Sequence, residues 1–158
     1  MENTIHIRLA KKSDAELIHN ILSDSFKAYQ ELFTEGAYAV MVVSPKGVEK
    51  RLNQGPIWIA EHEGEIAGTI GGMELIHTFQ IRGMVVLPHL RGLKIGYQLL
   101  RYVENYARQN NYHSLSLLTT AHIDEGIKLY KKFGFKIINK PPYEIDGTHC
   151  IYMEKLIL

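Results

Sequence analysis

The sequence lacks disulfide bonds, membrane-spanning segments and an apolar signal region. Cys150 is the only cysteine in 158 residues, which excludes a disulfide within the chain and suits a reducing interior. No apolar run approaches the ~20 residues that span a bilayer. The N-terminal stretch MENTIHIRLAKK has no apolar signal region. We therefore expect a soluble, cytoplasmic protein with no membrane partner.

An excess of charge of one sign is missing too. The 18 Lys and Arg residues balance 17 Asp and Glu residues, which leaves a formal net charge of +1. A nucleic-acid-binding protein usually carries a basic face, whereas the short pairs Lys11-Lys12 and Lys131-Lys132 are typical of solvated helix ends. We expect no nucleic-acid partner.

Metal-binding and nucleotide-binding motifs are also absent from the sequence. The chain has eight histidines, but no pair has ligand spacing, and His62-Glu63 is not followed by the second histidine of a zinc helix. Ile95-Gly96-Tyr97 offers no magnesium ligand of the kind that kinases and nucleotide hydrolases use. Gly68, Gly71 and Gly72 do not form G-x-G-x-x-G, so they indicate a bend or a close-packed neighbour. We expect no metal.

What the sequence has is a regular succession of strand and helix patterns. Its length suits a single domain over residues 1–158, and no repeat or low-complexity tract marks a boundary. Apolar runs and alternations predict strands at 4–9, 57–62, 65–76, 79–86, 113–119, 135–138 and 150–156. Helical spacing predicts helices from the capping box Ser13-Asp14-Ala15-Glu16 to Phe26, and at 45–53, 95–110 and 123–133. This order predicts a mixed α/β (α+β) fold whose sheet is neither wholly parallel nor a repeated crossover.

The stretch from Gly83 to Asn110 organises the chain, because a buried strand there leads through a short loop into an amphipathic helix. The N–H groups at the start of a helix point outward and favour an anion. Gly92 and Gly96 let a bulky group approach the backbone, and Arg91 and Lys94 add positive charge. The natural guest of this loop is a phosphate.

The loop itself, Arg91-Gly92-Leu93-Lys94-Ile95-Gly96, resembles the pyrophosphate loop of the GNAT superfamily of N-acetyltransferases. The family pattern is Gln or Arg, two residues, Gly, one residue, and Gly or Ala. Arg91 and Gly96 match this pattern, whereas Lys94 replaces the inner glycine. The preceding residues Val86-Leu87-Pro88-His89-Leu90-Arg91 reproduce the Val-x-Pro-x-x-Arg segment that leads into the loop in the family. The alternative is a plain strand-to-helix connection with a surface arginine.

A second segment extends the resemblance. Leu129-Tyr130-Lys131-Lys132-Phe133-Gly134-Phe135 is similar to the Leu-Tyr-x-x-x-Gly-Phe segment of the family and lies at the expected distance after the loop. The family often has Asn seven residues before this Tyr and Ala four residues before it, where this chain has Ile123 and Gly126. The motifs and the element order cover residues 5–157. The resemblance implies a mixed, mostly antiparallel sheet of about seven strands flanked by about four helices.

Transfer of an acetyl group from acetyl-CoA to a primary amine by direct attack is the activity that the resemblance implies. Backbone N–H groups over residues 91–96 would hold the pyrophosphate, which makes cofactor-binding residues of Arg91, Gly92, Leu93, Lys94, Ile95 and Gly96. The strand before the loop would carry a bulge and pair with the pantetheine through Met84, Val85 and Val86. Lys94 stiffens the backbone where the family has glycine, although its ammonium group can reach a phosphate.

Tyr130 occupies the position of the family's general acid. A phenol with a pKa of about 10 stays protonated at neutral pH and can give a proton to a leaving thiolate. The alternative is that Tyr130 is a packed core ring on an apolar helix face.

The general base is not identified by the sequence. Relatives that resemble histone acetyltransferases use a Glu where this chain has Gln80, which cannot act as a base. Glu74, His77 and His122 are candidates, directly or through water, and each is also explained as an ordinary surface or strand residue. Deprotonation by solvent is a further alternative.

The acceptor and the oligomeric state remain open alternatives. The aromatic region around Gly36, with Tyr29, Phe33 and Tyr38, is either a helical segment packed on the core or the wall of a pocket for a small amine. We favour a small-molecule amine over a protein N-terminus or lysine; a non-catalytic acyl-CoA-binding module is the other alternative. The apolar closing strand CIYMEKLIL suggests that two copies of the chain pair as a homodimer.

Overall fold

The chain forms one large sheet flanked by helices in the computed structural model, which describes residues 5–158. The strands of the large sheet are β1 (Ile5–Leu9), β2 (Ile57–His62), β3 (Glu65–Glu74), β4 (Thr78–Val86), β5 (Ser114–Thr119), β6 (Lys136–Ile138) and β9 (Ile151–Leu156). The α-helices are α1 (Ala15–Phe26), α2 (Glu35–Met41), α3 (Pro45–Leu52), α4 (Ile95–Gln109) and α5 (Asp124–Phe133). Thr4, which we expected in the first strand, lies outside the described residues.

The large sheet is mixed and mostly antiparallel, which confirms the predicted fold class. Its seven strands follow the order β1-β2-β3-β4-β5-β9-β6. Among these strands only β4 and β5 run parallel. A parallel pair needs a crossover, and α4 supplies it between these two strands. The described part of the chain has one α-helix more than expected, because the aromatic region before Ser44 folds into α2.

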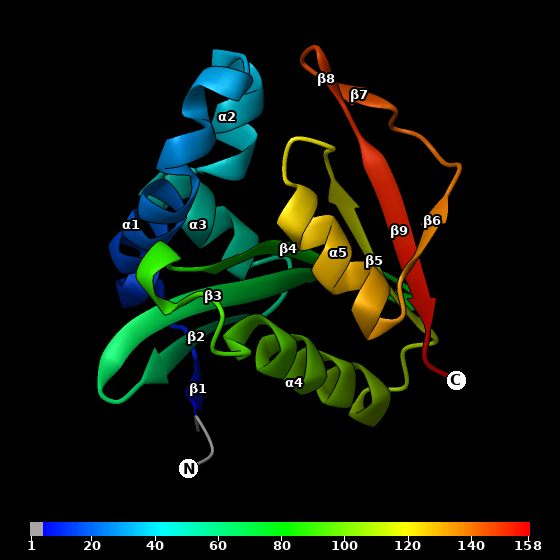
Figure 1. Cartoon of the computed structure of the whole chain (residues 1–158). Coiled ribbons are helices and arrows are strands. Elements are labelled where there is room, and N and C mark those ends of the chain that lie inside the picture. Colours follow the sequence, from blue (N-terminus) through cyan, green and yellow to red (C-terminus); the bar gives the residue numbers. More distant parts are fainter. Residues whose placement is uncertain (1–4) are drawn as a thin grey trace.

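Helices cover both faces of the sheet (Figure 1). The side chains of β2 show why two layers form, since successive residues of a strand point to opposite faces. Trp58 and Ala60 belong to the apolar cluster that includes the buried face of α4. Ile57 and Ile59 belong to the other cluster, with α1 and α3. Both faces of β2 are buried, which explains why its sequence is an almost continuous apolar run.

The glycines of β3 are explained by close neighbours, as predicted. A Cβ atom built on Gly68 would lie 2.3 Å from the carbonyl oxygen of Val85. At Gly72 it would lie 2.2 Å from the ring of Phe79. Phe79 is fully buried and also packs edge-on against Tyr106 and Tyr112. Any larger residue at Gly72 would displace this aromatic group.

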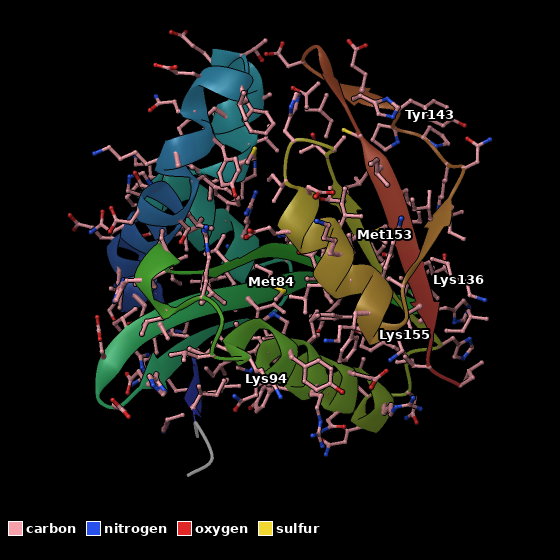
Figure 2. All side chains as sticks on the ribbon, in the orientation of Figure 1. Met84, Lys94, Lys136, Tyr143, Met153 and Lys155 are labelled. Carbon is pink, nitrogen blue, oxygen red and sulfur yellow. The ribbon has the colours of Figure 1, made fainter. Side chains whose placement is uncertain are left out.

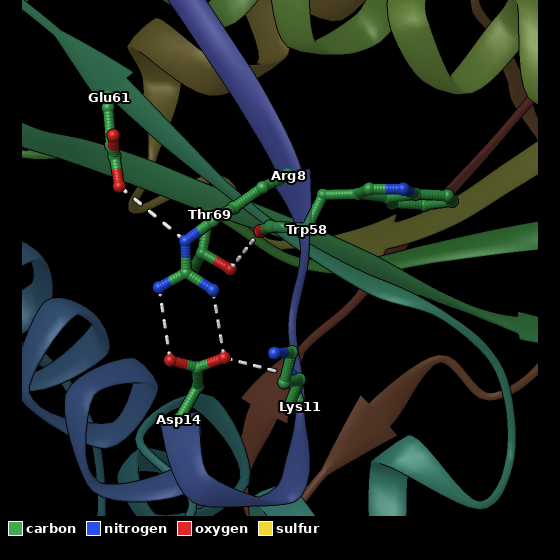
Figure 3. A network of polar contacts seen from close by, with 6 residues as sticks. All are labelled: Arg8, Lys11, Asp14, Trp58, Glu61 and Thr69. Carbon is green, nitrogen blue, oxygen red and sulfur yellow. Dashed lines mark hydrogen bonds and ion pairs between the residues drawn. The ribbon is translucent and has the colours of Figure 1, made fainter.

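The start of α1 differs from the prediction. Instead of a capping box led by Ser13, a 3₁₀ turn (Lys12–Asp14) precedes the helix, and the Asp14 carboxylate accepts the Lys11 N–H at 2.8 Å. The same carboxylate accepts two bonds from the Arg8 guanidinium, at 2.9 and 3.0 Å, and Glu61 lies 3.5 Å from Arg8 Nε (Figure 3). The hydrogen bond from Arg8 lowers the pKa of Asp14. An ion pair between residues six positions apart, one on β1 and one in the turn before α1, therefore fixes this end of the helix.

The other predicted turns and caps around α3 and β2 are confirmed. Ser44 Oγ accepts the N–H of Gly47 at 3.1 Å at the start of α3, with Pro45 as the first helical residue. Glu63 and Gly64 both take positive φ angles, 50° and 77°, as a two-residue hairpin turn requires.

The C-terminal region corrects two expectations. The predicted loop 140–147 contains a strand, β7 (Glu144–Ile145), which pairs with β8 (Thr148–His149) in a small separate hairpin. The closing strand β9 lies between β5 and β6; it pairs with β5 along its whole length and with β6 over Tyr152 to Glu154. Because β6 occupies the middle of the second edge, a second copy of the chain cannot pair along the whole of β9 as expected for the homodimer.

Among residues 5–158, no helix is both long and apolar enough to cross a membrane. In the same range no three or more His, Cys, Asp and Glu side chains are grouped as metal ligands.

Candidate active site

The strand β4 carries a bulge just before its end. Thr69 pairs with Val85 and Gly71 pairs with Arg82, so Ile70 of β3 faces two residues of β4, Gly83 and Met84. Gly83 has a φ of 64°, a conformation that side-chain-bearing residues rarely adopt. Such a bulge bends the strand and increases its local twist.

Beyond this bend β4 separates from β5. The parallel pairing of the two strands runs from Thr78 and Ser114 to Ile81 and Leu117 and stops there. β5 continues to Thr119 against β9, and β4 continues to Val86 against β3. The last residues of β4 therefore present backbone N–H and C=O groups toward an opening with no neighbouring strand among those described. An extended ligand can add to such an edge as a strand would.

The loop after β4 turns sharply into α4. A 3₁₀ turn, η3 (Pro88–Leu90), is followed by Gly92 with a φ of 87° and by Lys94 with a φ of 62° and a ψ of 21°. Lys94 thus takes the left-handed conformation for which glycine is preferred, which explains why the family pattern has glycine there. The loop keeps this shape at a cost of about 1 kcal/mol for a residue with a side chain.

The N-terminus of α4 offers unpaired donors. The N–H of Gln98 donates to the carbonyl of Lys94, so the N–H groups of Ile95, Gly96 and Tyr97 have no acceptor within the helix. Figure 2 labels Lys94 in the turn that leads into α4 and Met84 on the part of β4 that faces α5. The helix dipole adds partial positive charge at this point.

Gly96 lines the groove and also has a packing role that the sequence did not indicate. A Cβ atom there would lie 2.9 Å from Leu129 Cδ2 and 3.3 Å from Met84 Cε. The glycine therefore allows α4 to pack closely against α5 and β4. At Gly92 a Cβ atom would meet nothing within 4 Å, so only the positive φ favours glycine there.

Arg91 ties the loop to two other elements. Its Nε donates to the carbonyl oxygen of Val86 at 3.0 Å, and its Nη2 donates to that of Ser25 at 3.2 Å. These bonds fix the loop relative to the end of β4 and to α1. Arg91 is therefore a positioning residue for the loop as well as a positive charge near it.

A groove with a volume of about 670 Å³ runs along this loop and the end of β4. Eight of the nine residues expected to hold a cofactor line it: Met84, Val85, Val86, Arg91, Gly92, Lys94, Ile95 and Gly96. The ninth, Leu93, packs against the core cluster under α4. Lys132 and Glu125 add one charge of each sign from α5.

A second cavity, of about 310 Å³, lies on the other side of the β4 bulge. Its walls come from segments far apart in the chain, namely α2, α3, the ends of β4 and β5, and the hairpin of β7 and β8. Thr34 Oγ1 joins two of these walls by donating to Asp146 in the hairpin turn. The aromatic region accounts for part of the wall, because Phe33 lines this cavity, and Tyr29 lines the groove instead. The region is helical in α2, and Ala37, Val40 and Met41 of this helix line the cavity with Phe33.

The groove and the cavity share four lining residues: Phe26, Met84, Ile123 and Tyr130. Tyr130 is half-buried on α5, with its ring 5.9 Å from that of Phe135 in an edge-on contact. Its hydroxyl has no hydrogen-bond partner among the described residues. Burial raises the pKa of Tyr130 to about 12. The phenol is thus protonated at neutral pH, and it lies where the two hollows meet.

The candidates for a general base lie in different places. Glu74 accepts a hydrogen bond from the Tyr106 hydroxyl at 2.7 Å, outside the cavity. His77 stacks on His113 at a ring distance of 4.8 Å, also outside it. His122 lies beside the cavity, 5.4 Å from the ring of Phe33. None of the residues that line the cavity, among those described, carries a carboxylate or an imidazole.

Two arginines of the cavity were not predicted as site residues. Arg51 of α3 and Arg82 of β4 both line it, together with Gln80. The hairpin of β2 and β3 lies between them in the sequence. Neither arginine belongs to a sequence motif. The tertiary structure brings both into one cavity.

The comparisons with known proteins agree with this geometry. Residues 16–135 match the model of the acetyltransferase (GNAT) family. An uncharacterized N-acetyltransferase of Schizosaccharomyces pombe is 32% identical over 92 residues, which cover 54% of this chain and 56% of that protein. The N-acetylaspartate synthetase of Danio rerio is 32% identical over 102 residues, which cover 63% of this chain and 36% of that protein. This chain thus spans about half or less of the length of these two relatives.

Another relative matches over most of both chains. The aminoalkylphosphonate N-acetyltransferase of Salmonella typhimurium is 30% identical over 139 residues, which cover 82% of this chain and 84% of that protein. Among solved structures, the PaiA N-acetyltransferase from Thermoplasma acidophilum in complex with coenzyme A has a TM-score of 0.81 at 20% identity. The alignment covers 97% of this chain and 99% of that one. At this identity the likeness concerns the fold.

Proposed function

The chain belongs to the GNAT family of acetyltransferases, and from this we propose that it transfers the acetyl group of acetyl-CoA to the primary amine of a small molecule by direct attack. The observation that carries the proposal is the meeting of the groove and the cavity at Tyr130. A transferase with direct attack needs two binding sites that touch at one point. We propose one catalytic domain over residues 1–158, because the two hollows draw on segments from α1 to β8.

The groove fits acetyl-CoA on the basis of its own donors. The free N–H groups at the start of α4 suit a pyrophosphate, with Lys94 beside them. The open edge of β4 at Met84, Val85 and Val86 suits an extended amide chain, which is the shape of pantetheine. We propose these three residues and residues 91, 92 and 94–96 as direct contacts, and Leu93 as a core residue that supports the loop.

Acetyl-CoA supplies a thioester: the acceptor nitrogen bonds to the carbonyl carbon, the C–S bond breaks, and the sulfur leaves as a thiolate. Tyr130 gives its phenolic proton to that sulfur and regains one from solvent. The phenol is protonated at neutral pH, and its raised pKa extends the protonated range to higher pH. The bulge at Gly83 re-aims the backbone N–H groups of β4 toward the opening, where one of them can polarise the carbonyl.

The acceptor loses its proton without a carboxylate in the cavity. We propose that water takes the proton and that His122, which lies beside the cavity, can assist. Gln80 lines the cavity where some relatives have a Glu base, and it can only hydrogen-bond the acceptor.

A small acceptor is supported by the dimensions of the cavity and by one relative. A volume of about 310 Å³ is at the low end of ligand pockets. The relative from Salmonella typhimurium is named for a small aminoalkylphosphonate. We propose that the reaction takes place in the cytoplasm, since the free thiol of Cys150 suits a reducing compartment.

The test is the release of CoA thiol from acetyl-CoA in the presence of single amines. The panel contains amino acids, aminophosphonates, a polyamine, an aminoglycoside and a peptide with a free N-terminus. We expect at least one small amine to be acetylated and the peptide to react much more slowly. Binding of acetyl-CoA without turnover of any amine would instead support a non-catalytic acyl-CoA-binding module and contradict the proposal.

A further inference from the structure

The two arginines of the cavity have no acidic partner among the described residues. Neither Arg51 nor Arg82 takes part in an ion pair, and no carboxylate lines the cavity. Other arginines of the chain, such as Arg8 and Arg108, do pair with carboxylates. Unpaired guanidinium groups that are partly removed from water are costly, so proteins keep them mainly where they bind something.

Arg51 is held beside the bulge of β4. Its Nη2 donates to the carbonyl oxygen of Val40 at 2.8 Å, which links α3 to the end of α2. A Cβ atom on Gly83 would lie 3.3 Å from Arg51 Nη1. The missing side chain at Gly83 therefore leaves room for the guanidinium next to the point where β4 bends. A guanidinium has five N–H donors, and this contact uses one of them.

Arg82 lies on β4 directly before the bulge and reaches the cavity from this strand. Its Nη2 donates to Oε1 of Gln54, at the end of α3, and its remaining donors stay available. Burial lowers the pKa of both arginines, for Arg51 to about 10, and the charge of Arg82 contributes to the shift at Arg51. Both remain protonated at neutral pH. The cavity therefore holds two cations that feel each other's charge.

An anion on the ligand would relieve this repulsion. Carboxylates and phosphonates match the fork of a guanidinium and accept two bonds from it. Tyr130 and Met84 line the part of the cavity that joins the groove, whereas Arg51 lies by the side that α2 and α3 form. A molecule with an amine at one end and an anion at the other would therefore fill the cavity lengthwise.

We infer that the acceptor is an amine that carries a carboxylate or a phosphonate, which Arg51 and Arg82 bind while the amine faces the groove. This rests on the proposed function, since it concerns the acceptor of that reaction. It disfavours polyamines, because a second or third ammonium group would meet the arginines. It also gives Gly83 a second role, which is to admit the Arg51 side chain.

The test compares matched acceptors and matched variants. Glycine and glycinamide differ by one carboxylate, and 2-aminoethylphosphonate and ethanolamine differ by the phosphonate; spermidine serves as the polycation. We expect kcat/KM to be at least tenfold higher for the anionic member of a pair. Arg82→Gln and Arg51→Lys should remove most of this preference, and Arg82→Glu should reverse it. Arg101→Gln, on the exposed face of α4, is the control and should retain the wild-type preference.

Binding is measured separately by calorimetric titration of the same amines in the presence of CoA, which does not depend on turnover. The inference is supported if Arg82→Gln no longer binds the anionic amines while thermal unfolding shows that its fold is intact. This holds even if no amine is acetylated, and in that case only the transferase proposal fails. Equal binding and equal turnover of charged and neutral members overturns the inference and leaves the transferase proposal intact. Failure of wild-type protein to bind any anionic amine also overturns it.

Discussion

The groove and the cavity are built in opposite ways. Most of the groove comes from one continuous stretch, the end of β4, the loop and the first turn of α4, with part of α5. The cavity is assembled from α2, α3, the bend of β4 and a hairpin more than 100 residues after the first of these. A site made of neighbouring residues leaves a motif in the sequence. A site made of distant ones leaves none, and it is free to change with the acceptor.

The residue shared by both regions gives the largest expected effect. Tyr130→Phe removes the proton donor but keeps the ring that separates groove from cavity. We expect kcat to fall about 100-fold, the usual size of a general-acid contribution, while the KM for acetyl-CoA changes little. Steady-state kinetics by thiol release is the measurement. Tyr102→Phe is the control, since Tyr102 packs on Trp58 outside both hollows. An unchanged kcat in Tyr130→Phe would assign the ring to packing alone.

Two substitutions of opposite sign sharpen the description of the groove. Positions 92 and 94 both have positive φ angles, for which glycine is preferred, but only position 92 carries a glycine; position 94 carries Lys94. Gly92→Ala should lower the free energy of unfolding by about 1 kcal/mol, since a Cβ atom would meet nothing there and only backbone strain remains. Lys94→Gly should raise it by roughly 0.5–1 kcal/mol, because the strain is removed. Urea unfolding of the free protein measures both. Destabilisation by Lys94→Gly would mean that the lysine side chain supports the loop.

The smallest effect concerns the dependence of kcat on pH: we expect kcat not to decline at alkaline pH. The acid must be protonated, and a raised pKa extends the protonated range upward. Because the pKa of Tyr130 is about 12, kcat should not fall between pH 8 and about 10. An ordinary phenol, with a pKa of about 10, would be half ionised at the upper end of this range. Stopped assays with saturating substrates over this range are the check. A descending limb near pH 9 that disappears in Tyr130→Phe would contradict the raised pKa.

The same contrast explains what the sequence predicted. The fold class followed from local patterns, as in β2 with its apolar run and α3 with Ser44 and Pro45 at its start. The loop residues could be named because a strand, a turn and a helix N-terminus are consecutive. The pairing of β9 between β5 and β6 depends on tertiary contacts, so it could not be predicted. The ion pair of Arg8 with Asp14 spans six residues and depends on how the chain turns between β1 and α1, which no motif in the sequence indicates.

The two arginines that we propose to bind the acceptor were not predicted, for the same reason. Arg51 and Arg82 are ordinary charged residues of a helix and a strand in the sequence, and only the tertiary structure brings them into one cavity. The packing role of Gly96 could not be predicted for a similar reason, because the nearest atom that a Cβ there would meet, in Leu129, belongs to another helix.

The central claim is that acetyl-CoA binds in the groove at the end of β4 and the start of α4. Calorimetric titration of the purified protein with acetyl-CoA tests it most directly, with Arg91→Ala and Arg101→Ala beside the wild type. Arg91 fixes the loop through the carbonyls of Val86 and Ser25, so its loss should weaken binding about tenfold, which is about 1.4 kcal/mol. We predict micromolar affinity for the wild type and the same affinity for Arg101→Ala. No binding by the wild type, or equal binding by all three proteins, would contradict the account.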